Sequence, residues 1–502
     1  MQMRPVLLVA SGLLACLPLL AAGHQAEPDP APRQVLKVDR YDDDEAPGSL
    51  RWAITTANAA PGTYRIEIAA VGVAPYVIKP RAPLPEIKGP VAIVGLPFAQ
   101  SGQYVAIDGA AYVTGTGTQA CPGAVPGQYG TNVRTTTLPG LVLRDTQGVE
   151  LAGLEVRNFC IGVLINRSHD NWLHDNRIVA NKGGAGVMLT GDDGNGQSTP
   201  TTTVHNRVVR NEFIDNGDGL ELTRGAAWNL VADNLFRSTD ANPEPSQGIE
   251  ILWGNDNLVL RNRFEDYSDG LQINWGNRNT IAANTFTGNS IGVSLTGRDN
   301  VVDGNTITGN GIGVALRPQP VSRPNRITGN AIFGNGLRIE RCQAGGACVP
   351  GQARGAIVFG VPGLEHADFV GSRGGGVESD PAKLAKICSA RVTDHCQPAP
   401  NDGLAAPVVE QARRSGTSLQ IQGQLHGTAN TVQRVEVFGN PRASDTEAAR
   451  YLGDALVTTD AQGQARFSFA VPATADVAGV TATVTAVDGA TSPLSAPRAV
   501  AR

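Results

Sequence analysis

Short stretches of alternating apolar and polar residues recur along most of this chain. In Gly292-Val293-Ser294-Leu295, for example, apolar side chains stand at every second position after a glycine. Such alternation predicts a β-strand, because a helix would place its apolar residues three and four positions apart. Glycine-led phrases of this kind begin at Gly162, Gly186, Gly219, Gly248, Gly270, Gly292 and Gly313.

A second phrase places two asparagines five residues apart beside fixed apolar positions. It occurs seven times, at Asn171/Asn176, Asn206/Asn211, Asn229/Asn234, Asn257/Asn262, Asn279/Asn284, Asn300/Asn305 and Asn325/Asn330. The last three steps between the glycine-led phrases are 22, 22 and 21 residues, which is a solenoid period. Stacked coils pair such short strands in parallel about 4.8 Å apart around one apolar core. The predicted fold class is therefore all-β, a right-handed parallel β-helix with asparagine ladders between its coils.

The ends of the chain depart from the repeat and set the domain boundaries. Residues 1–23 carry one early charge, an apolar run and then small residues, which predicts a secretory signal peptide and a periplasmic location. The apolar run is too short for a membrane-spanning helix, so no membrane insertion is expected. Cys16 stands in a phrase that faintly resembles a lipoprotein cleavage site, and its lipidation stays open. The other predicted units are an N-terminal helical cap and first coils over 24–137, β-helix repeats over 138–362, a cap or linker over 363–403, and a small β-sandwich over 404–502.

Charge and cysteine content narrow the function classes. The formal net charge is −5 and no run of lysine or arginine occurs, which argues against a nucleic-acid partner and leaves small molecules or glycans. Six cysteines follow the signal peptide, an even number suited to disulfides in an oxidising compartment. Cys342 with Cys348 and Cys388 with Cys396 would close short loops, which leaves Cys121 with Cys160; a metal site would need tighter spacing.

Candidate chemistry emerges when the coils are aligned on the repeated glycine. The residue two positions after it points out of the cylinder, and this row reads Leu164, Met188, Glu221, Glu250, Gln272, Ser294 and Ala315. On the same three coils Asp218, Gln247 and Asp269 precede the glycine, while Arg224, Trp253 and Trp275 follow it by five positions. A solenoid is most stable when its repeats agree, so three rows that depart together indicate a functional site.

Two long steps in the repeat and the C-terminal unit complete this prediction. The polar residues of these three rows, on the coils that begin at Gly219, Gly248 and Gly270, are called the polar strip. Steps of 33 and 29 residues between glycine-led phrases reveal insertions at 191–203 and 238–246. Both insertions are expected to emerge beside the polar strip and to enclose it as a pocket. The strip is complete without residues 404–502, so deleting the sandwich is expected to leave turnover within about tenfold.

The carboxylates have a catalytic and a structural interpretation. Glu221 and Glu250, one strand spacing apart, should repel one another, and such a pair often has one raised pKa, which suits general acid–base catalysis. The structural alternative is two solvated surface carboxylates. Asp218 and Asp269 are further catalytic candidates, unless they only satisfy backbone donors in the turn.

The cation and the two indoles are candidates for substrate binding. Arg224 either neutralises Glu221 or binds a substrate anion. Trp253 and Trp275 either pack or form a platform for a flat ligand ring.

Several long phrases give the chain a family resemblance. They resemble the periplasmic, pectin-lyase-fold type of 3-dehydroshikimate dehydratase from quinate and shikimate catabolism, over nearly the whole mature chain. The phrases are Tyr129–Arg134, Phe213–Ala227, Pro243–Asp256, Tyr267–Gly276 and Gly371–Gly376. The resemblance carries no catalytic assignment with it, so the site residues rest on the row argument.

The resemblance implies an enzyme, a hydro-lyase that turns 3-dehydroshikimate, a small cyclic anion, into protocatechuate and water. Such a reaction needs a base, an acid for the leaving hydroxyl, a donor for the enolate oxygen and a cation for the carboxylate. We expect Glu221 and Glu250 to share the first two roles, Gln272 or Asn274 to supply the third and Arg224 the fourth. No cofactor is required by the sequence; a divalent metal ion stays open, since an unrelated barrel-fold enzyme uses one for this reaction.

A polysaccharide lyase or glycoside hydrolase acting on an acidic glycan is the alternative function. The fold commonly carries such enzymes, and two carboxylates about 5 Å apart would suit a retaining glycosidase. A polymer, however, needs a groove lined over many coils, whereas this strip is polar over three.

Overall fold

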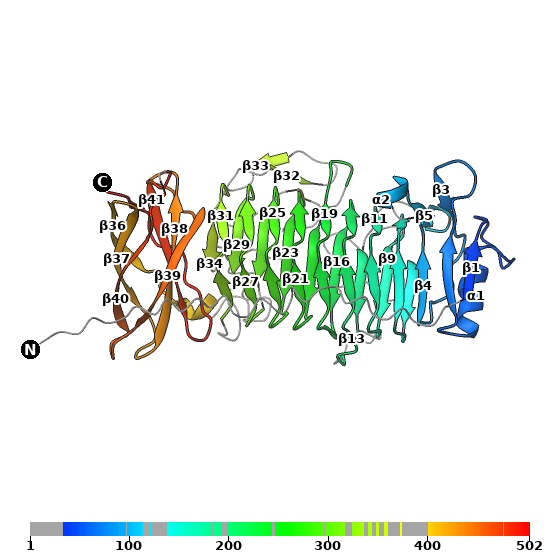
Figure 1. Cartoon of the computed structure of the whole chain (residues 1–502), viewed down its shortest axis with the longest axis horizontal. Coiled ribbons are helices and arrows are strands. Elements are labelled where there is room, and N and C mark those ends of the chain that lie inside the picture. Colours follow the sequence, from blue (N-terminus) through cyan, green and yellow to red (C-terminus); the bar gives the residue numbers. More distant parts are fainter. Residues whose placement is uncertain are drawn as a thin grey trace, which may run out of the picture.

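The computed structural model describes residues 34–96, 98–113, 121, 138–181, 184–191, 199–242, 246–295, 297–316, 324–335, 340–343, 348–350, 356–359, 372–373, 400–474 and 476–501. Parallel strands wind into a long stack of coils that ends against an antiparallel unit (Figure 1). The predicted signal peptide and Cys16 lie outside the described residues.

Three parallel sheets form the walls of the β-helix, as the alternation predicts. The first contains β1 (Gln34–Val38), β2 (Tyr64–Ile68), β4 (Val91–Val94), β7 (Val149–Ala152), β10 (Trp172–His174), β14 (Arg207–Val209), β18 (Leu230–Ala232), β21 (Leu258–Leu260), β24 (Thr280–Ala282), β27 (Val301–Asp303) and β30 (Arg326–Thr328). The second contains β3 (Tyr76–Ile78), β5 (Val105–Asp108), β8 (Leu154–Arg157), β11 (Arg177–Val179), β15 (Glu212–Ile214), β19 (Leu235–Arg237), β22 (Arg263–Glu265), β25 (Thr285–Thr287), β28 (Thr306–Thr308) and β31 (Ala331–Phe333).

The third sheet carries the candidate site. Its strands, in spatial order, are β6 (Pro139–Arg144), β9 (Ile161–Asn166), β12 (Ala185–Thr190), β16 (Asp218–Thr223), β20 (Gln247–Leu252), β23 (Asp269–Asn274), β26 (Ile291–Leu295), β29 (Ile312–Leu316) and β34 (Ile357–Phe359). Neighbouring strands pair in the register obtained by aligning the repeated glycines, so that Glu221 faces Glu250 and Glu250 faces Gln272.

Buried ladders hold consecutive coils in this register. All fourteen predicted asparagines are buried, and each coil bonds to the next as Asn234 does: its Nδ2 donates to Asn262 Oδ1 over 2.9 Å and to the Val208 carbonyl. Inside the cylinder, the rings of Phe213, Phe236, Phe264 and Phe286 stack with centroids 4.5 to 4.9 Å apart. A slip of one residue would break the ladder and the ring stack together, so the register is strongly specified.

Helix α1 (Leu50–Ala59) covers the N-terminal end of the stack, as predicted (Figure 1). The Ser49 hydroxyl accepts a hydrogen bond from the Trp52 amide over 3.1 Å and so caps the helix. Leu50 and Ile54, spaced at helical period, are buried against the first coils.

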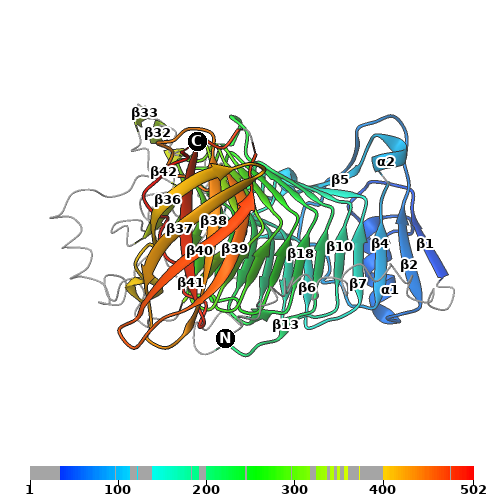
Figure 2. The ribbon, with the colours of Figure 1, turned by 60° about the vertical axis from the view of Figure 1, so that its left-hand side comes forward.

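The C-terminal unit is a sandwich of two antiparallel sheets, as predicted, and it closes the other end of the stack (Figure 2). One sheet contains β36 (Val408–Ser415), β37 (Ser418–His426) and β40 (Gln464–Pro472); the other contains β38 (Val432–Asn440), β39 (Arg450–Thr458), β41 (Gly479–Ala486) and β42 (Arg498–Ala499).

The sandwich covers the last coil through backbone and side-chain contacts. Ile332 and Ala448 exchange backbone hydrogen bonds of 2.8 and 2.9 Å, and Glu436 Oε2 accepts from the Gly329 amide over 3.0 Å. Phe438 enters the same apolar core as the coils. Most of the predicted cap or linker over 363–403 lies outside the described residues, and at its end Asn401 continues the asparagine ladder from Asn325.

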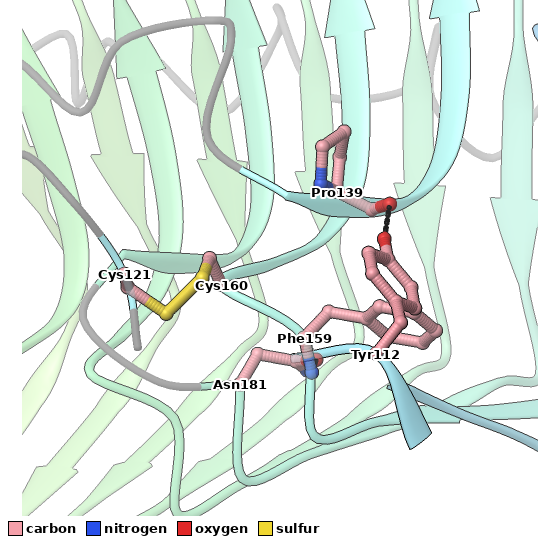
Figure 3. Close-up of a disulfide and its surroundings, with 6 residues drawn as sticks. All are labelled: Tyr112, Cys121, Pro139, Phe159, Cys160 and Asn181. Carbon is pink, nitrogen blue, oxygen red and sulfur yellow. Dashed lines mark hydrogen bonds between the residues drawn. A yellow bond between two sulfur atoms is a disulfide. The ribbon is translucent and has the colours of Figure 1, made fainter. Parts of the chain in front are cut away.

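The predicted disulfides differ in how far the structure describes them. Cys121 and Cys160 are bonded, which confirms that pair, and Figure 3 shows the bond beside Phe159 at the start of β9. Cys342 and Cys348 are register partners in the antiparallel pair β32 (Glu340–Gln343) and β33 (Cys348–Pro350), which brings their backbones together. The proposed pair of Cys388 and Cys396 lies outside the described residues.

Candidate active site

Three carboxyl groups from two adjacent strands converge on the outer face of the third sheet. One carboxylate oxygen from each of Asp218, Glu221 and Glu250 lies within 4.8 Å of the other two. Asp218 is the first residue of β16 and Glu221 lies three positions further along the same strand, on either side of Gly219. A Cβ on Gly219 would come within 2.6 Å of the Phe236 ring, so this close approach requires glycine.

The two glutamates are buried rather than solvated, and Asp218 is partly exposed, which argues against the surface interpretation of the glutamate pair. Glu221 is 4% exposed and Glu250 is 6% exposed. Burial, together with the charges of Asp218 and Glu250, holds the pKa of Glu221 well above its usual range. The raised pKa predicted for one member of the pair is thus found at Glu221.

Asp218 and Glu221 form a proton-sharing pair. Burial also raises the pKa of Asp218, but the Gln247 amide, the Ser246 hydroxyl and Glu221 all hydrogen-bond to its carboxyl group and oppose that rise. The Gln247 amide donates to Asp218 Oδ1 over 2.9 Å. A neutral Glu221 that donates its proton to ionised Asp218 satisfies both groups.

Amide side chains on β23 connect Glu250 to Asp269. Asn274 Nδ2 donates to Glu250 Oε1 over 3.0 Å and to Gln272 Oε1 over 2.6 Å. Gln272 Nε2 donates to Asp269 Oδ2 over 2.8 Å. A donor directed at a carboxyl group favours its ionised form, so the surroundings of Glu250 differ from those of Glu221, whose pKa is raised by burial and by nearby carboxylates.

The third row forms a stack of one cation and two indoles. The Arg224 guanidinium carbon lies 4.4 Å from the centroid of the Trp253 ring, and the Trp253 and Trp275 rings stack 4.8 Å apart at 13°. Because these residues come from consecutive coils, both faces of Trp253 are occupied. A flat ligand can meet the edges of this stack but cannot lie on the face of Trp253, which refines the predicted platform.

Apolar residues bound the strip on its N-terminal side, as the rows predict. A buried cluster on the outer face of β6, β9 and β12 consists of Val142, Ile161, Leu164, Ala185 and Met188. Met188 is the register partner of Glu221. This apolar neighbour contributes to the desolvation that keeps Glu221 protonated.

One described end of each insertion lies beside the strip, while residues 192–198 and 243–245, which are expected to enclose it, lie outside the described residues. Gly191 at the start of the first donates its amide to the Arg224 carbonyl over 2.6 Å. Ser246, at the end of the second, hydrogen-bonds through its hydroxyl to Gln247 and Asp218. Sequence reasoning did not assign Ser246 to the site; its position at the end of the insertion and next to the row of Asp218 was the available signal.

The carboxyl cluster has the oxygen ligands that hard divalent cations prefer. Its hydrogen bonds, however, already serve a different purpose: Glu221 shares a proton with Asp218, and an amide hydrogen points at Glu250. A cation would have to displace both. The residues therefore fit acid–base chemistry better than metal binding.

Comparisons with known proteins agree with the fold and identify a full-length relative. The family described as "Right handed beta helix region" matches residues 128–264, and the family "Periplasmic copper-binding protein (NosD)" matches 231–345. A 3-dehydroshikimate dehydratase of Acinetobacter baylyi is 56% identical over 484 residues, which is 96% of this chain and 97% of that protein.

Solved structures show weaker likeness. An alginate lyase from Paenibacillus sp. is 12% identical over 59% of this chain and 94% of its own, with a TM-score of 0.38. A periplasmic alginate epimerase is 15% identical over 50% of this chain and 57% of its own, with a TM-score of 0.34. Among the described residues, no helix is long and apolar enough to cross a membrane.

Proposed function

The chain belongs to the 3-dehydroshikimate dehydratase family, and we propose that the buried carboxyl cluster on β16 and β20 is where it converts 3-dehydroshikimate into protocatechuate and water. The observation that carries this assignment is the pair of register-matched, buried glutamates in different surroundings: the pKa of Glu221 is held well above its usual range, and Glu250 accepts a hydrogen bond from Asn274. Elimination of water needs one acid and one base side by side.

Glu250 is the base and Glu221 the acid in this mechanism. The Glu250 carboxylate removes the proton from the carbon next to the ketone, and the electron pair forms an enolate. The enolate collapses to the ketone and expels the β-hydroxyl, which takes the Glu221 proton and leaves as water. A ring proton then moves to the ketone oxygen, which makes the ring aromatic. The proton on Glu250 returns to the neighbouring Glu221, and the resting state is restored.

The other residues orient the substrate and stabilise charge. Gln272 lies on the strand next to Glu250, and the amide hydrogen that it does not donate to Asp269 is the donor for the enolate oxygen, because both hydrogens of Asn274 Nδ2 already bond to Glu250 and Gln272. Arg224, fixed over Trp253, binds the substrate carboxylate at the edge of the stack. Asp218 accepts a hydrogen bond from the protonated Glu221 and so keeps the proton on Glu221 between turnovers.

The relatives and the strip also bear on location and on the alternative function. The NosD family is described as periplasmic, which supports export of this chain by the predicted signal peptide to that compartment. A glycan-degrading activity has no support of comparable strength, since the full-length relative is a dehydratase and the polar strip spans three coils.

Substitution of each glutamate tests the mechanism. Glu221→Gln and Glu250→Gln should each lower kcat by at least about 10²-fold, the scale of one general acid or base, and the double variant should be little worse than the more damaged single one. Arg224→Ala should mainly raise KM. Protocatechuate formation from 3-dehydroshikimate, followed by absorbance, measures all four.

Glu212→Gln is the matched control, because Glu212 lies on the same coil as Glu221 but in the second sheet. Chelation by EDTA should leave turnover unchanged if the cluster acts by proton transfer without a metal ion. Near-normal kcat in both glutamine variants would refute the assignment of the cluster as the catalytic site.

A further inference from the structure

Asp269 lies at the start of β23, buried and separated from Glu250 by two amide side chains. Its Oδ2 accepts a hydrogen bond from Gln272 Nε2 over 2.8 Å. Gln272 Oε1 in turn accepts from Asn274 Nδ2 over 2.6 Å, and the same Nδ2 donates to Glu250 Oε1 over 3.0 Å. The bonds form one continuous path from carboxylate to carboxylate.

Two contacts of Gln272 set the direction of the bonds in this path: its Nε2 donates to Asp269 over 2.8 Å, and its Oε1 accepts a longer bond of 3.4 Å from Gln247 Nε2. An amide side chain has nearly the same shape when its oxygen and nitrogen exchange places, so shape alone does not orient Gln272 or Asn274. An ionised carboxylate, in contrast, only accepts hydrogen bonds. Asp269 therefore draws the nitrogen of Gln272 towards itself and turns its oxygen to Asn274, which then presents its own nitrogen to Glu250.

We propose that Asp269 is a positioning residue, which acts through Gln272 and Asn274 to direct a hydrogen-bond donor at Glu250 and so keeps Glu250 in the base form. The inference rests on the proposed function, because it assumes that Glu250 is the base. It assigns Asp269 a role distinct from the direct catalytic one considered from the sequence, since its contact with Glu250 is indirect.

The charges around Glu250 make such a device necessary. Within the described part of the chain, the acidic groups near it are Glu221 and Asp218 on β16 and, through the amides, Asp269 on β23, while Arg224 lies over the neighbouring Trp253. Burial and the two nearby carboxyl groups favour a protonated Glu250, which could not act as a base. The Asn274 donor opposes that tendency.

Replacing Asp269 by asparagine should release the path. The new amide can donate to Gln272, which lets Gln272 and then Asn274 turn over and present an oxygen to Glu250. Glu250 would then hold a proton at neutral pH. The acid limb of the pH profile of kcat/KM, which reports the base of the free enzyme, should move up by about one pH unit or more, while the alkaline plateau stays well above that of Glu250→Gln.

A double-variant cycle separates positioning from packing. Asn274→Leu removes the donor directly and should move the acid limb in the same direction. Asp269→Asn combined with Asn274→Leu should move it no further than Asn274→Leu alone, because Asp269 acts through Asn274. Asp233→Asn is the control, since Asp233 pairs with Arg261 at an exposed turn and should leave the profile unchanged.

The outcomes distinguish this inference from the mechanism beneath it. A Glu250→Gln variant with normal turnover would overturn the base assignment and the positioning role together. If Glu250→Gln is inactive but the acid limb of Asp269→Asn does not move, the positioning role alone is overturned. A loss of kcat in Asp269→Asn that is the same at every pH would also overturn it. Should Asp269→Asn not fold, Gln272→Met interrupts the same path, and its acid limb must shift upward for the inference to stand.

Discussion

Replacing Glu436 by glutamine should stabilise the protein above pH 7 and leave its stability unchanged at low pH, where Glu436 is protonated. Glu436 is fully buried on β38, where the sandwich meets the last coil, and accepts the Gly329 amide. Burial raises the pKa of this carboxyl to about 7, although the charge of Arg434 and the Gly329 hydrogen bond oppose the rise. Asp454 and Asp303 add to it.

The sign and size of the effect follow from linkage. Between the usual value of 4.5 and about 7 the folded protein binds more protons at this group than the unfolded chain does, so stability falls as the pH rises through that window. A shift of this size corresponds to about 3 kcal/mol at pH 8, at about 1.4 kcal/mol per pH unit. Glutamine resembles the protonated glutamate and can still accept the Gly329 amide, so the variant should escape this loss.

Urea unfolding at several pH values between 4 and 8 measures the difference. The free energy of unfolding of the variant, minus that of the wild type, should grow from near zero to about 3 kcal/mol across this range. Glu410→Gln, a half-exposed carboxylate near Arg466 on the same sandwich, is the control and should show no such trend. Parallel pH dependences for Glu436→Gln and wild type would refute the account of the cap.

Two further changes probe the stack itself. Deleting residues 404–502 should give insoluble or partly unfolded protein, because the deletion exposes the edges of β30 and β31 and removes Phe438 from the core. Size-exclusion chromatography measures this. A soluble truncation with turnover within about tenfold would instead agree with the expectation from the sequence alone. Asn234→Ala should lower the free energy of unfolding by about 2–4 kcal/mol, since it leaves the Asn211 amide and the Val208 carbonyl without their buried partner; a change below about 0.5 kcal/mol would show that the ladder is dispensable.

The repeat made most of the fold predictable. Paired asparagines and alternating apolar residues specify coil length, strand type and register. The sequence alone therefore predicts that Glu221 and Glu250 lie opposite one another, as they do in the sheet. The capping role of the sandwich was not predictable, because it depends on contacts such as that of Glu436 with Gly329, far apart in sequence. No periodic signal marks a contact between two differently built units.

The site was predictable as a set of residues but not as a network. Row alignment identified Glu221, Glu250 and Asp269, since departures from a repeat are visible in sequence. Which carboxyl group keeps its proton depends on burial and on amide orientation, and neither is encoded in periodicity. The stacking of Arg224 on Trp253 also required coordinates, because the sequence equally allowed an ion pair with Glu221.

The Trp253–Trp275 stack gives the protein an optical readout of its own site. Two stacked indoles with centroids 4.8 Å apart lie close enough for their electronic transitions to couple, so the absorption and fluorescence of the pair differ from those of isolated tryptophans. The Arg224 guanidinium lies over the Trp253 ring. A ligand that moves the guanidinium away from the ring should therefore change the spectrum of the tryptophan pair. Spectroscopy of these tryptophans can therefore report substrate binding without an added label. Inactive glutamine variants suit this measurement, because they would bind the substrate without converting it.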